Sequence, residues 1–355
     1  MKSINLSDLD RLVVGALLAH PRATQAQVGH AVRSSEATVS RRMSRLFRSG
    51  LLRVTGVLDD EASHRARSLF VRLRCSPGAA HRAALKLAQW KETGSVKLLT
   101  GSIDCVAEIG YTSNEHLLHL MMEELPRLDG VVATSSNQVI RRFSTPHSWN
   151  PGLLPEPALQ TLHAARLDHW NEHPYPAAAP PLSSLEEQLV ELLTADGRRG
   201  WQELADSCGV TPSTARRRVE SLMSRGILRM RTVIEPEHIG LPVNAFVWLS
   251  INPTQLGAAG EVLARHPDVL MIAATTGDRN LCGEIALASD AALYDFLSGT
   301  VGSLPGLLHA DVAVGLRTVK RAGKILPEPA DDDRGDVASQ TSSAARAHTP
   351  SRSDD

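Results

Sequence analysis

Residues 213–229 read STARRRVESLMSRGILR, and residues 37–53 read ATVSRRMSRLFRSGLLR. The two stretches are offset by 176 residues, and each predicts a short basic helix that ends at a glycine, Gly226 or Gly50. At about 100° per residue, each helix turns one apolar stripe inward and arginines outward. The inward residues are Val39, Met43, Leu46 and Phe47 in the first helix and Ala215, Val219, Leu222 and Met223 in the second.

Each basic helix is predicted to be the last of three. In the second copy, residues 182–197 have apolar residues at helical spacing, and residues 201–208 form a shorter helix before Gly209. Thr211 is then a suitable N-cap with Pro212 at the first helical position, and Ser35 takes the capping place in the first copy. Three helices with a tight turn before the last form a helix-turn-helix.

The repeat continues far beyond the basic helix. Without a gap, the same offset aligns Leu17 with Leu193, Arg22 with Arg198, Arg41 with Arg217, Phe70 with Phe246, Glu108 with Glu284, and Gly130 with Gly306. Solenoid repeats have periods of roughly 20 to 50 residues. A period of 176 residues therefore indicates a duplicated pair of domains.

After each helical unit the apolar period changes to that of strands. In the second copy we expect strands over 244–251, 269–275, 281–287 and 308–317, with helices over 255–265 and 290–299. The order βαββαβ predicts a ferredoxin-like domain, in which helices cover one face of an antiparallel sheet. Residues 68–141 repeat this order, so the fold class is α+β with two tandem copies.

The predicted domains follow from these patterns. The residue ranges are 1–60 for the first helix-turn-helix domain, 65–145 for the first ferredoxin-like sensor domain, 146–181 for a proline-rich linker, 182–235 for the second helix-turn-helix domain, 240–325 for the second sensor domain, and 326–355 for a disordered tail. The linker begins and ends in prolines, with a short helical stretch over 158–170.

The charge of the chain is unevenly distributed. The formal net charge is −1, yet residues 33–53 and 209–231 each hold six arginines and one acid. Such patches suit a polyanion. The N-terminus lacks the features of a signal peptide, no apolar stretch approaches the length of a membrane span, and the four cysteines are isolated. We expect a cytoplasmic protein with reduced thiols, no metal and no cofactor.

In their order, these features resemble those of the Lrp/AsnC (leucine- and asparagine-responsive) family of bacterial transcription regulators. The resemblance is carried by the helical unit, HPDVLMIAATTGDRNLCGEIAL (266–287) and SLPGLLHADVAVGLRTVKR (303–321). Members of this family bind DNA as dimers, and their sheet domains pair to form a site for an amino acid or related effector. The resemblance thus implies a nucleoid-associated regulator, with a dimer fused into one chain and the capacity for larger assemblies.

The resemblance places the DNA contacts at the start of each basic helix. Hydroxyls suit phosphates, and arginine can grip a phosphate or the edge of guanine in two places. The expected DNA-binding residues are Ser35, Thr38, Ser40, Arg41, Arg42 and Arg45 in the first copy and Thr211, Ser213, Thr214, Arg216, Arg217 and Arg218 in the second. Because the two helices differ in sequence, we predict an asymmetric operator.

The resemblance also implies an effector site at a turn of the type TGDxD. The residues at this turn are Thr100, Gly101 and Asp104 in the first copy and Thr276, Gly277, Asp278 and Asn280 in the second. Each copy keeps a single acid, because Ser102 and Asn280 replace the others. This leaves two interpretations, an altered and one-sided ligand preference or the loss of effector sensing.

Two other functions compete with DNA-binding regulation. Siroheme decarboxylases share this architecture, including fused pairs, so a tetrapyrrole enzyme is the main alternative. Such an enzyme needs converging basic and histidine side chains, but His163, His169 and His173 of the linker do not share one rigid face. GxSxG, P-loop and HExxH motifs are absent, so we do not expect an enzyme. A third interpretation is a dimerisation or adaptor protein that does not bind DNA.

Overall fold

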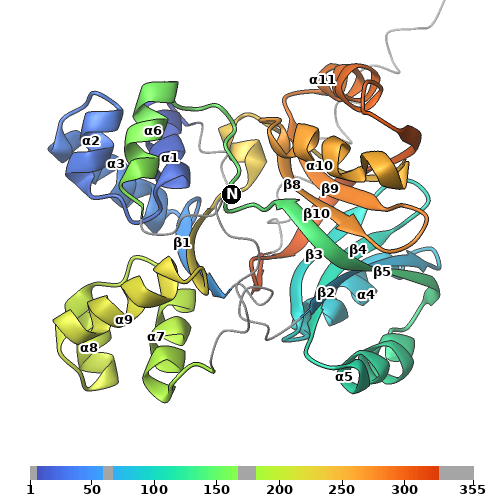
Figure 1. The fold of residues 1–355 in the computed structure, drawn as a ribbon, viewed down its shortest axis with the longest axis horizontal. Helices are drawn as coiled ribbons and strands as arrows, with labels where there is room; N and C mark the ends of the chain where they lie inside the picture. Colours follow the sequence, from blue (N-terminus) through green and yellow to red (C-terminus); the bar gives the residue numbers. More distant parts are fainter. Residues whose placement is uncertain (1–5, 59–66, 167–180, 328–355) are drawn as a thin grey trace, which may run out of the picture.

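The computed structural model describes residues 6–58, 67–166 and 181–327. In Figure 1, two helical heads lie on the left and a barrel of strands lies on the right. The first head contains α1 (Asp8–Ala19), α2 (Gln25–Ala31) and α3 (Glu36–Arg48), and the second contains α7 (Ser184–Ala195), α8 (Trp201–Cys208) and α9 (Pro212–Ser224). Within the described residues, no helix is long and apolar enough to cross a bilayer.

Matched caps begin the helices of the two heads. A capping box between Ser7 and Asp10 starts α1, and one between Ser183 and Glu186 starts α7. The N-caps of the last helices are Ser35 and Thr211, as the sequence predicts. The apolar stripes of α3 and α9 lie in the head cores, with only Phe47 left half-buried.

The barrel is built from two sets of strands and helices. The first set contains β2 (Arg67–Cys75), α4 (Ala80–Gln89), β3 (Thr93–Leu99), β4 (Cys105–Tyr111), α5 (Asn114–His119) and β5 (Val131–Ser144). The second contains β7 (Val243–Ile251), α10 (Leu256–Ala264), β8 (Val269–Thr275), β9 (Leu281–Leu287), α11 (Asp290–Asp295), β10 (Leu307–Arg321) and the short β11 (Lys324–Ile325). Helices α5 and α11 continue as wider π-helical turns over Leu120–Glu124 and Phe296–Val301.

The strands of the two sets follow one another in the sequence and close together into one ring. The spatial order is β3-β4-β2-β5 in the first set and β8-β9-β7-β10 in the second, with antiparallel neighbours. The two sheets are joined because β5 also pairs with β8 and β10 also pairs with β3. Aromatic side chains fill the interior, where the ring centre of Phe246 lies 5.5 Å from that of Phe70 and 4.6 Å from that of Trp248.

A two-stranded ladder connects the heads. Strand β1 (Arg53–Leu58) follows the first head, β6 (Leu228–Val233) follows the second, and the two pair in antiparallel register. The close approach of α7 to β1 favours glycine at position 56, because a Cβ atom there would lie 3.1 Å from Leu193 Cβ. The strand that follows each head is therefore paired with the strand that follows the other head.

The first half of the predicted linker is not a free connection between domains, because it is packed against the first head. Residues 149–166 pack against the first head, and they include helix α6 (Glu156–Ala164). Leu154, Leu159 and Leu162 are buried in the core that contains α1, and the indole of Trp149 donates to the carbonyl of Pro267 at 2.8 Å. The two buried leucines of α6 are spaced for one turn of helix, so the segment docks despite its prolines. Residues 167–180, with His169 and His173, and residues 328–355 of the predicted tail lie outside the described residues.

Candidate nucleic-acid interface and effector turns

The hydroxyl residues predicted to contact DNA lie together at the N-termini of α3 and α9. Ser35 Oγ accepts from the Thr38 amide at 3.3 Å, and Thr211 Oγ1 accepts from the Thr214 amide at 3.2 Å. Ser213 lies beside Thr211, with 3.0 Å between the hydroxyl oxygens. In each head these residues leave a polar and exposed helix start, where backbone N–H groups favour an anion. Ser40 is half-buried one turn further along α3.

The arginines of α3 are not equally available. Asp10 of α1 receives Arg42 at 3.0 Å and forms a closer ion pair with Arg45. Burial raises the pKa of Asp10, but hydrogen bonds from Ser7, Arg45 and Arg42 outweigh it and hold this pKa below its usual value. Arg41 is exposed and donates to Thr38 Oγ1 at 3.4 Å, so its guanidinium is available for a ligand.

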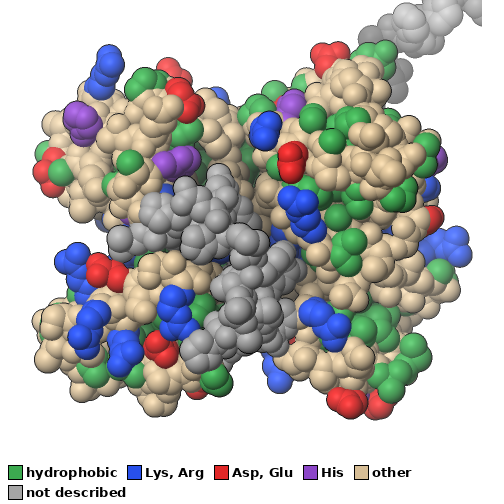
Figure 2. Space-filling view, in the orientation of Figure 1, with side chains coloured by type: hydrophobic (Ala, Val, Ile, Leu, Met, Phe, Trp, Pro, Cys, Tyr) green, Lys and Arg blue, Asp and Glu red, His purple; other side chains and the backbone are tan. Residues whose placement is uncertain are grey.

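In α9 the available arginines are at neighbouring positions. Arg216 is paired with Glu220 on the same helix, with Arg216 Nε at 2.7 Å from the carboxylate. Arg217 and Arg218 are exposed, and Arg217 is the equivalent of Arg41. In Figure 2 several Lys and Arg side chains gather on the lower left head, which contains α9. The two heads therefore share one exposed arginine at matching positions.

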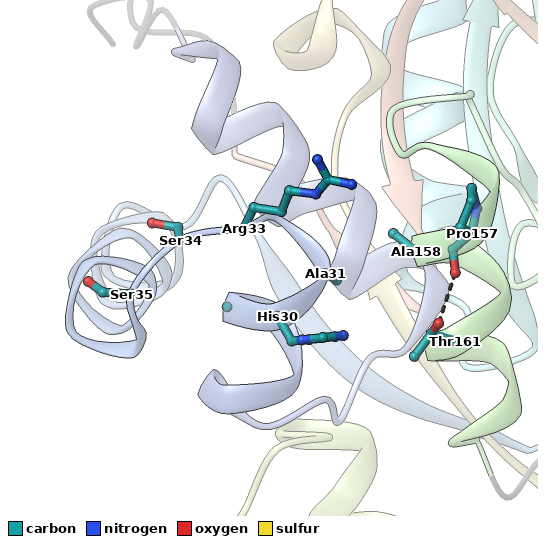
Figure 3. A pocket seen from close by; sticks show the side chains of 9 residues that line it. His30, Ala31, Arg33, Ser34, Ser35, Pro157, Ala158 and Thr161 are labelled. Atoms are coloured by element: carbon teal, nitrogen blue, oxygen red, sulfur yellow. Dashed lines mark hydrogen bonds between the residues drawn. The ribbon is translucent and has the colours of Figure 1, made fainter.

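A pocket of about 530 Å³ separates the turn of the first head from α6. Figure 3 shows His30, at the end of α2, and Arg33, in the turn after it, with their side chains pointing toward α6. In α6 Thr161 donates to the Pro157 carbonyl at 2.8 Å. Arg33 has a left-handed backbone with φ of 52°, at the position where the second head has Gly209 with φ of 64°. The pocket also borders Ser35, so α6 forms a wall beside the predicted DNA contacts.

The two predicted effector turns each dock on the last strand of the other copy. The amide of Thr100 donates to the Val314 carbonyl on β10 at 2.9 Å, and the Val314 amide donates to Thr100 Oγ1. In the same way, the amide of Thr276 donates to the Gln138 carbonyl on β5 at 2.9 Å, and the Gln138 amide donates to Thr276 Oγ1. These threonines thus join the copies at both seams of the barrel.

Polar residues after each turn hold a strand end. Asp104 accepts from the Cys75 amide at 2.7 Å, and Asn280 bonds both the amide and the carbonyl of Ile251 at 2.8 Å. Asp278 remains exposed. Gly101 and Gly277 have φ of 93° and 97°, which favours glycine. Of the acids predicted to bind an effector, Asp278 is the one whose carboxylate faces solvent.

Sequence reasoning missed a buried ionic cluster that joins the copies near the heads. Lys97 of β3 donates to Glu284 of β9, and Arg321 of β10 lies 3.3 Å from the same carboxylate. The three side chains are at most 7% exposed. Although burial opposes ionisation, Lys97 and Arg321 lower the pKa of Glu284 to about 2. Arg321 also pairs with Glu235 at 2.9 Å, just after β6. In the sequence, the one signal for this cluster was the alignment of Glu108 with Glu284 in the two copies.

Models of known protein families match most of the chain. The AsnC-type helix-turn-helix domain model matches residues 182–223, and a winged helix-turn-helix DNA-binding model matches residues 6–53. The Lrp/AsnC ligand binding domain model matches twice, at residues 68–148 and 244–325.

The similar proteins include both shorter and full-length matches. The HTH-type transcriptional regulator FL11 of Pyrococcus horikoshii is 25% identical over 146 residues, which cover 41% of this chain and 96% of the relative. LrpA of the same organism is 25% identical and covers 37% of this chain and 94% of the relative. These are archaeal proteins, so the matches extend beyond bacteria. The crystal structure of the siroheme decarboxylase NirDL is similar over 96% of this chain and 100% of its own, with a TM-score of 0.58 and 13% identity.

The heads and the two ligand-binding matches define a helix-turn-helix protein with ligand-binding domains. The chain belongs to the Lrp/AsnC family. The likeness to NirDL shows that the fold is shared over nearly the whole chain.

Proposed function

We propose that this protein is a sequence-specific DNA-binding transcriptional regulator of the Lrp/AsnC type that acts as a fused pseudo-dimer. The observation that carries the proposal is the pair of recognition helices, α3 and α9, with matched caps and an exposed arginine at positions 41 and 217. The names of relatives such as FL11 and LrpA support the same function. Bound to nucleoid DNA, such a regulator works in the cytoplasm.

The proposed DNA contacts are the twelve hydroxyl and arginine residues predicted at the starts of α3 and α9. Arg41 and Arg217 contact bases or phosphates directly. The ion pairs with Asp10 hold Arg42 and Arg45 at the side of the DNA groove that α3 enters. The turn of the first head is basic, with His30 and Arg33, so its grip on the phosphate backbone differs from that of the second head. This difference supports an asymmetric operator, and recovery of only perfect palindromes in a selection from random DNA would contradict it.

The decisive experiment is a salt-dependent DNA titration of charge-removing variants. Arg41→Gln and Arg217→Gln should each weaken specific binding by about 1–3 kcal/mol and reduce the salt slope by roughly 1. Arg82→Gln is the matched control, since Arg82 is an exposed arginine on α4, away from the heads. Equal behaviour of all three variants would contradict the proposed interface and favour an adaptor protein.

The domain organisation is part of this proposal. We assign residues 1–60 and 182–235 to helix-turn-helix domains and residues 65–145 and 240–325 to ferredoxin-like sensor domains, derived from one duplicated ancestor. Two observations support this: the strand orders of the two sets are equivalent, and one ligand-binding model matches both. Expression of residues 182–327 alone should give a homodimer, because the half would lack the strands that close its barrel.

An amino-acid effector is proposed to bind near the second effector turn. The exposed carboxylate of Asp278 suits an amino group, and Gly277 precedes it in the exposed turn that follows Thr276. In the first copy, Thr100 and Gly101 lie beside Ser102 instead of an acid, so binding should be one-sided. Calorimetric titration with the twenty amino acids tests this, with Asp278→Asn as the control. Flat traces for every amino acid would favour loss of sensing.

Paired apolar residues support self-association into larger assemblies. Three pairs of large exposed apolar residues occupy equivalent positions in the two copies: Leu118 and Tyr294, Val132 and Leu308, and Ile140 and Leu316. Large apolar side chains at equivalent exposed positions could pack against further copies of the chain, and their repeat in both copies supports this proposal.

The alternative function is that of a siroheme decarboxylase-like enzyme, which the shared fold with NirDL raises. Within residues 6–58, 67–166 and 181–327, His, Cys, Asp and Glu form no group of three suited to a metal ion. We propose a non-enzymatic regulator without a cofactor. A Soret band in the purified protein, or its appearance on adding an iron tetrapyrrole, would favour the enzyme instead.

A further inference from the structure

Two arginines at equivalent positions clasp the heads to each other. From the loop between α1 and α2, Arg22 donates to the carbonyls of Gly197 at 2.6 Å and Arg199 at 3.1 Å. From the matching loop between α7 and α8, Arg198 donates to the carbonyls of Pro21 at 2.6 Å and Ala23 at 2.9 Å. Each arginine thus binds the loop that carries the other arginine. We call these reciprocal contacts of Arg22 and Arg198 the clasp.

Each guanidinium also stacks on an aromatic ring of the opposite head. The Arg22 guanidinium carbon lies 4.4 Å from the ring centre of Trp201, at the start of α8. The guanidinium carbon of Arg198 lies 5.7 Å from the ring centre of Phe47, near the end of recognition helix α3. Burial, followed by the charge of Arg198, lowers the pKa of Arg22 to about 10, so the guanidinium stays charged at neutral pH. The clasp therefore contacts one recognition helix directly.

Hydrogen bonds to the ladder of β1 and β6 also hold the two heads in place. Thr55 of β1 donates to the Thr194 carbonyl of α7 at 2.7 Å, and Thr232 of β6 donates to the Leu17 carbonyl of α1 at 2.5 Å. Each head is thereby anchored to the ladder strand that follows the other head. The ladder alone could still flex or twist, whereas four guanidinium hydrogen bonds beside it oppose rotation of one head against the other.

We propose that Arg22 and Arg198 are positioning residues that fix the separation of the recognition helices, so that the protein accepts one spacing of operator half-sites. This inference rests on the proposed DNA binding. One added base pair moves a half-site by about 3.4 Å and rotates it by roughly 35°. A rigid pair of heads must then lose base contacts in one half-site or break the clasp.

The test compares half-site spacing in the full chain. The double variant Arg22→Met and Arg198→Met keeps apolar stems for the aromatic contacts but removes the donors. On duplexes with one base pair inserted or deleted, we expect wild-type affinity to fall by about tenfold or more, the loss of at least one good base contact. The double variant should discriminate less than about threefold. Arg199→Met is the matched control, since only the Arg199 carbonyl takes part in the clasp.

A second measurement needs no DNA. Spin labels at Ser44→Cys and Ser224→Cys, exposed positions on α3 and α9, report the distance between recognition helices after Cys75 and Cys208 are replaced by serine. The wild-type background should give one narrow distance distribution and the double variant a broad one. If the double variant does not fold, the single variant Arg22→Gln, which leaves the two bonds of the other arginine, replaces it.

The two measurements separate the clasp from the proposed function. A narrow distribution in the variant, or an unchanged spacing preference, would overturn the clasp inference. If the wild-type protein selects no duplex at all, the proposed function fails, and the distance distributions then decide the clasp alone.

Discussion

We expect Glu284→Gln to lower the free energy of unfolding by about 3 kcal/mol at pH 7. The Glu284 carboxylate accepts from Lys97 of the other copy and from Asn244, and Arg321 lies 3.3 Å away. The amide of glutamine keeps the shape but not the charge. Lys97 would then be buried without its counter-charge, either as an unpaired ammonium ion or after giving up its proton, and orphaning one partner of a buried ion pair costs about 3–5 kcal/mol.

The pKa of Glu284 gives a similar magnitude. It lies at about 2 in the folded protein against a usual value of 4.5, and a difference of about 2.5 units corresponds to roughly 3 kcal/mol. Because the folded pKa is the lower one, this stabilisation is fully present above pH 4.5 and is lost as the pH falls toward 2. The difference between wild type and variant should therefore shrink to about half near pH 3.

Urea unfolding followed by tryptophan fluorescence at pH 7 and pH 3 measures both effects. Glu108→Gln is the matched control, because Glu108 occupies the equivalent position, is 25% exposed and pairs with Arg142; its loss should cost only about 1 kcal/mol. Adding Lys97→Met to Glu284→Gln should restore more than half of the lost stability, because the unpaired charge is removed. Equal losses for the two glutamine variants, or a difference independent of pH, would refute the reasoning.

Three further perturbations probe the heads, the surface and the core. Asp10→Asn should release Arg45 and steepen the dependence of log affinity on log salt concentration, measured on random duplex DNA, by roughly 1. The loss of the capping box should lower the free energy of unfolding by about 1 kcal/mol. An unchanged salt slope would show that the freed arginine does not reach the DNA. Replacing both Ile140 and Leu316 with lysine should reduce self-association in sedimentation experiments, and an unchanged mass would exclude these residues from the contact. Burial, the largest cause, raises the pKa of the Cys282 thiol to about 12, so disulfide reagents at pH 8 should modify it only in urea; modification at equal rates in the folded protein would contradict the packing.

Local signals in the sequence were enough to place many elements. Caps and glycines predict the last helix of each head, because Thr211 and Pro212 can start a helix and a glycine with positive φ follows it at Gly226. Strands β8 and β9 lie where the sequence predicts them, over 269–275 and 281–287, on either side of the turn at Gly277. The predicted helix over 290–299 is α-helical only to Asp295, because a π-helical turn follows.

Contacts between distant segments gave no local signal. The ladder of β1 with β6 and the seams of β3 with β10 and β5 with β8 depend on three-dimensional packing, so periodicity cannot reveal them. The same holds for Lys97 and Glu284, which lie 187 residues apart. Docking of α6 was missed because only Leu159 and Leu162 mark its buried side. For the proposed DNA contacts, the sequence predicted the arginines but not the ion pairs that restrain Arg42 and Arg45.

The ionic cluster bears on why the two copies share one chain. Lys97 aligns with Ala273, so the pair of Lys97 with Glu284 occurs at one seam only, while Glu108 at the other seam pairs with Arg142. In a homodimer any lysine at this position would appear at both seams, whereas a single chain can keep it at one. The same freedom applies to the heads, where His30 and Arg33 have no basic counterparts in the aligned Asp206 and Gly209. Arg321 connects this asymmetric barrel to the strands that follow both heads, because it pairs with Glu235 after β6 and its carbonyl accepts from Arg53 of β1. This arrangement supports the proposed operator with two different half-sites.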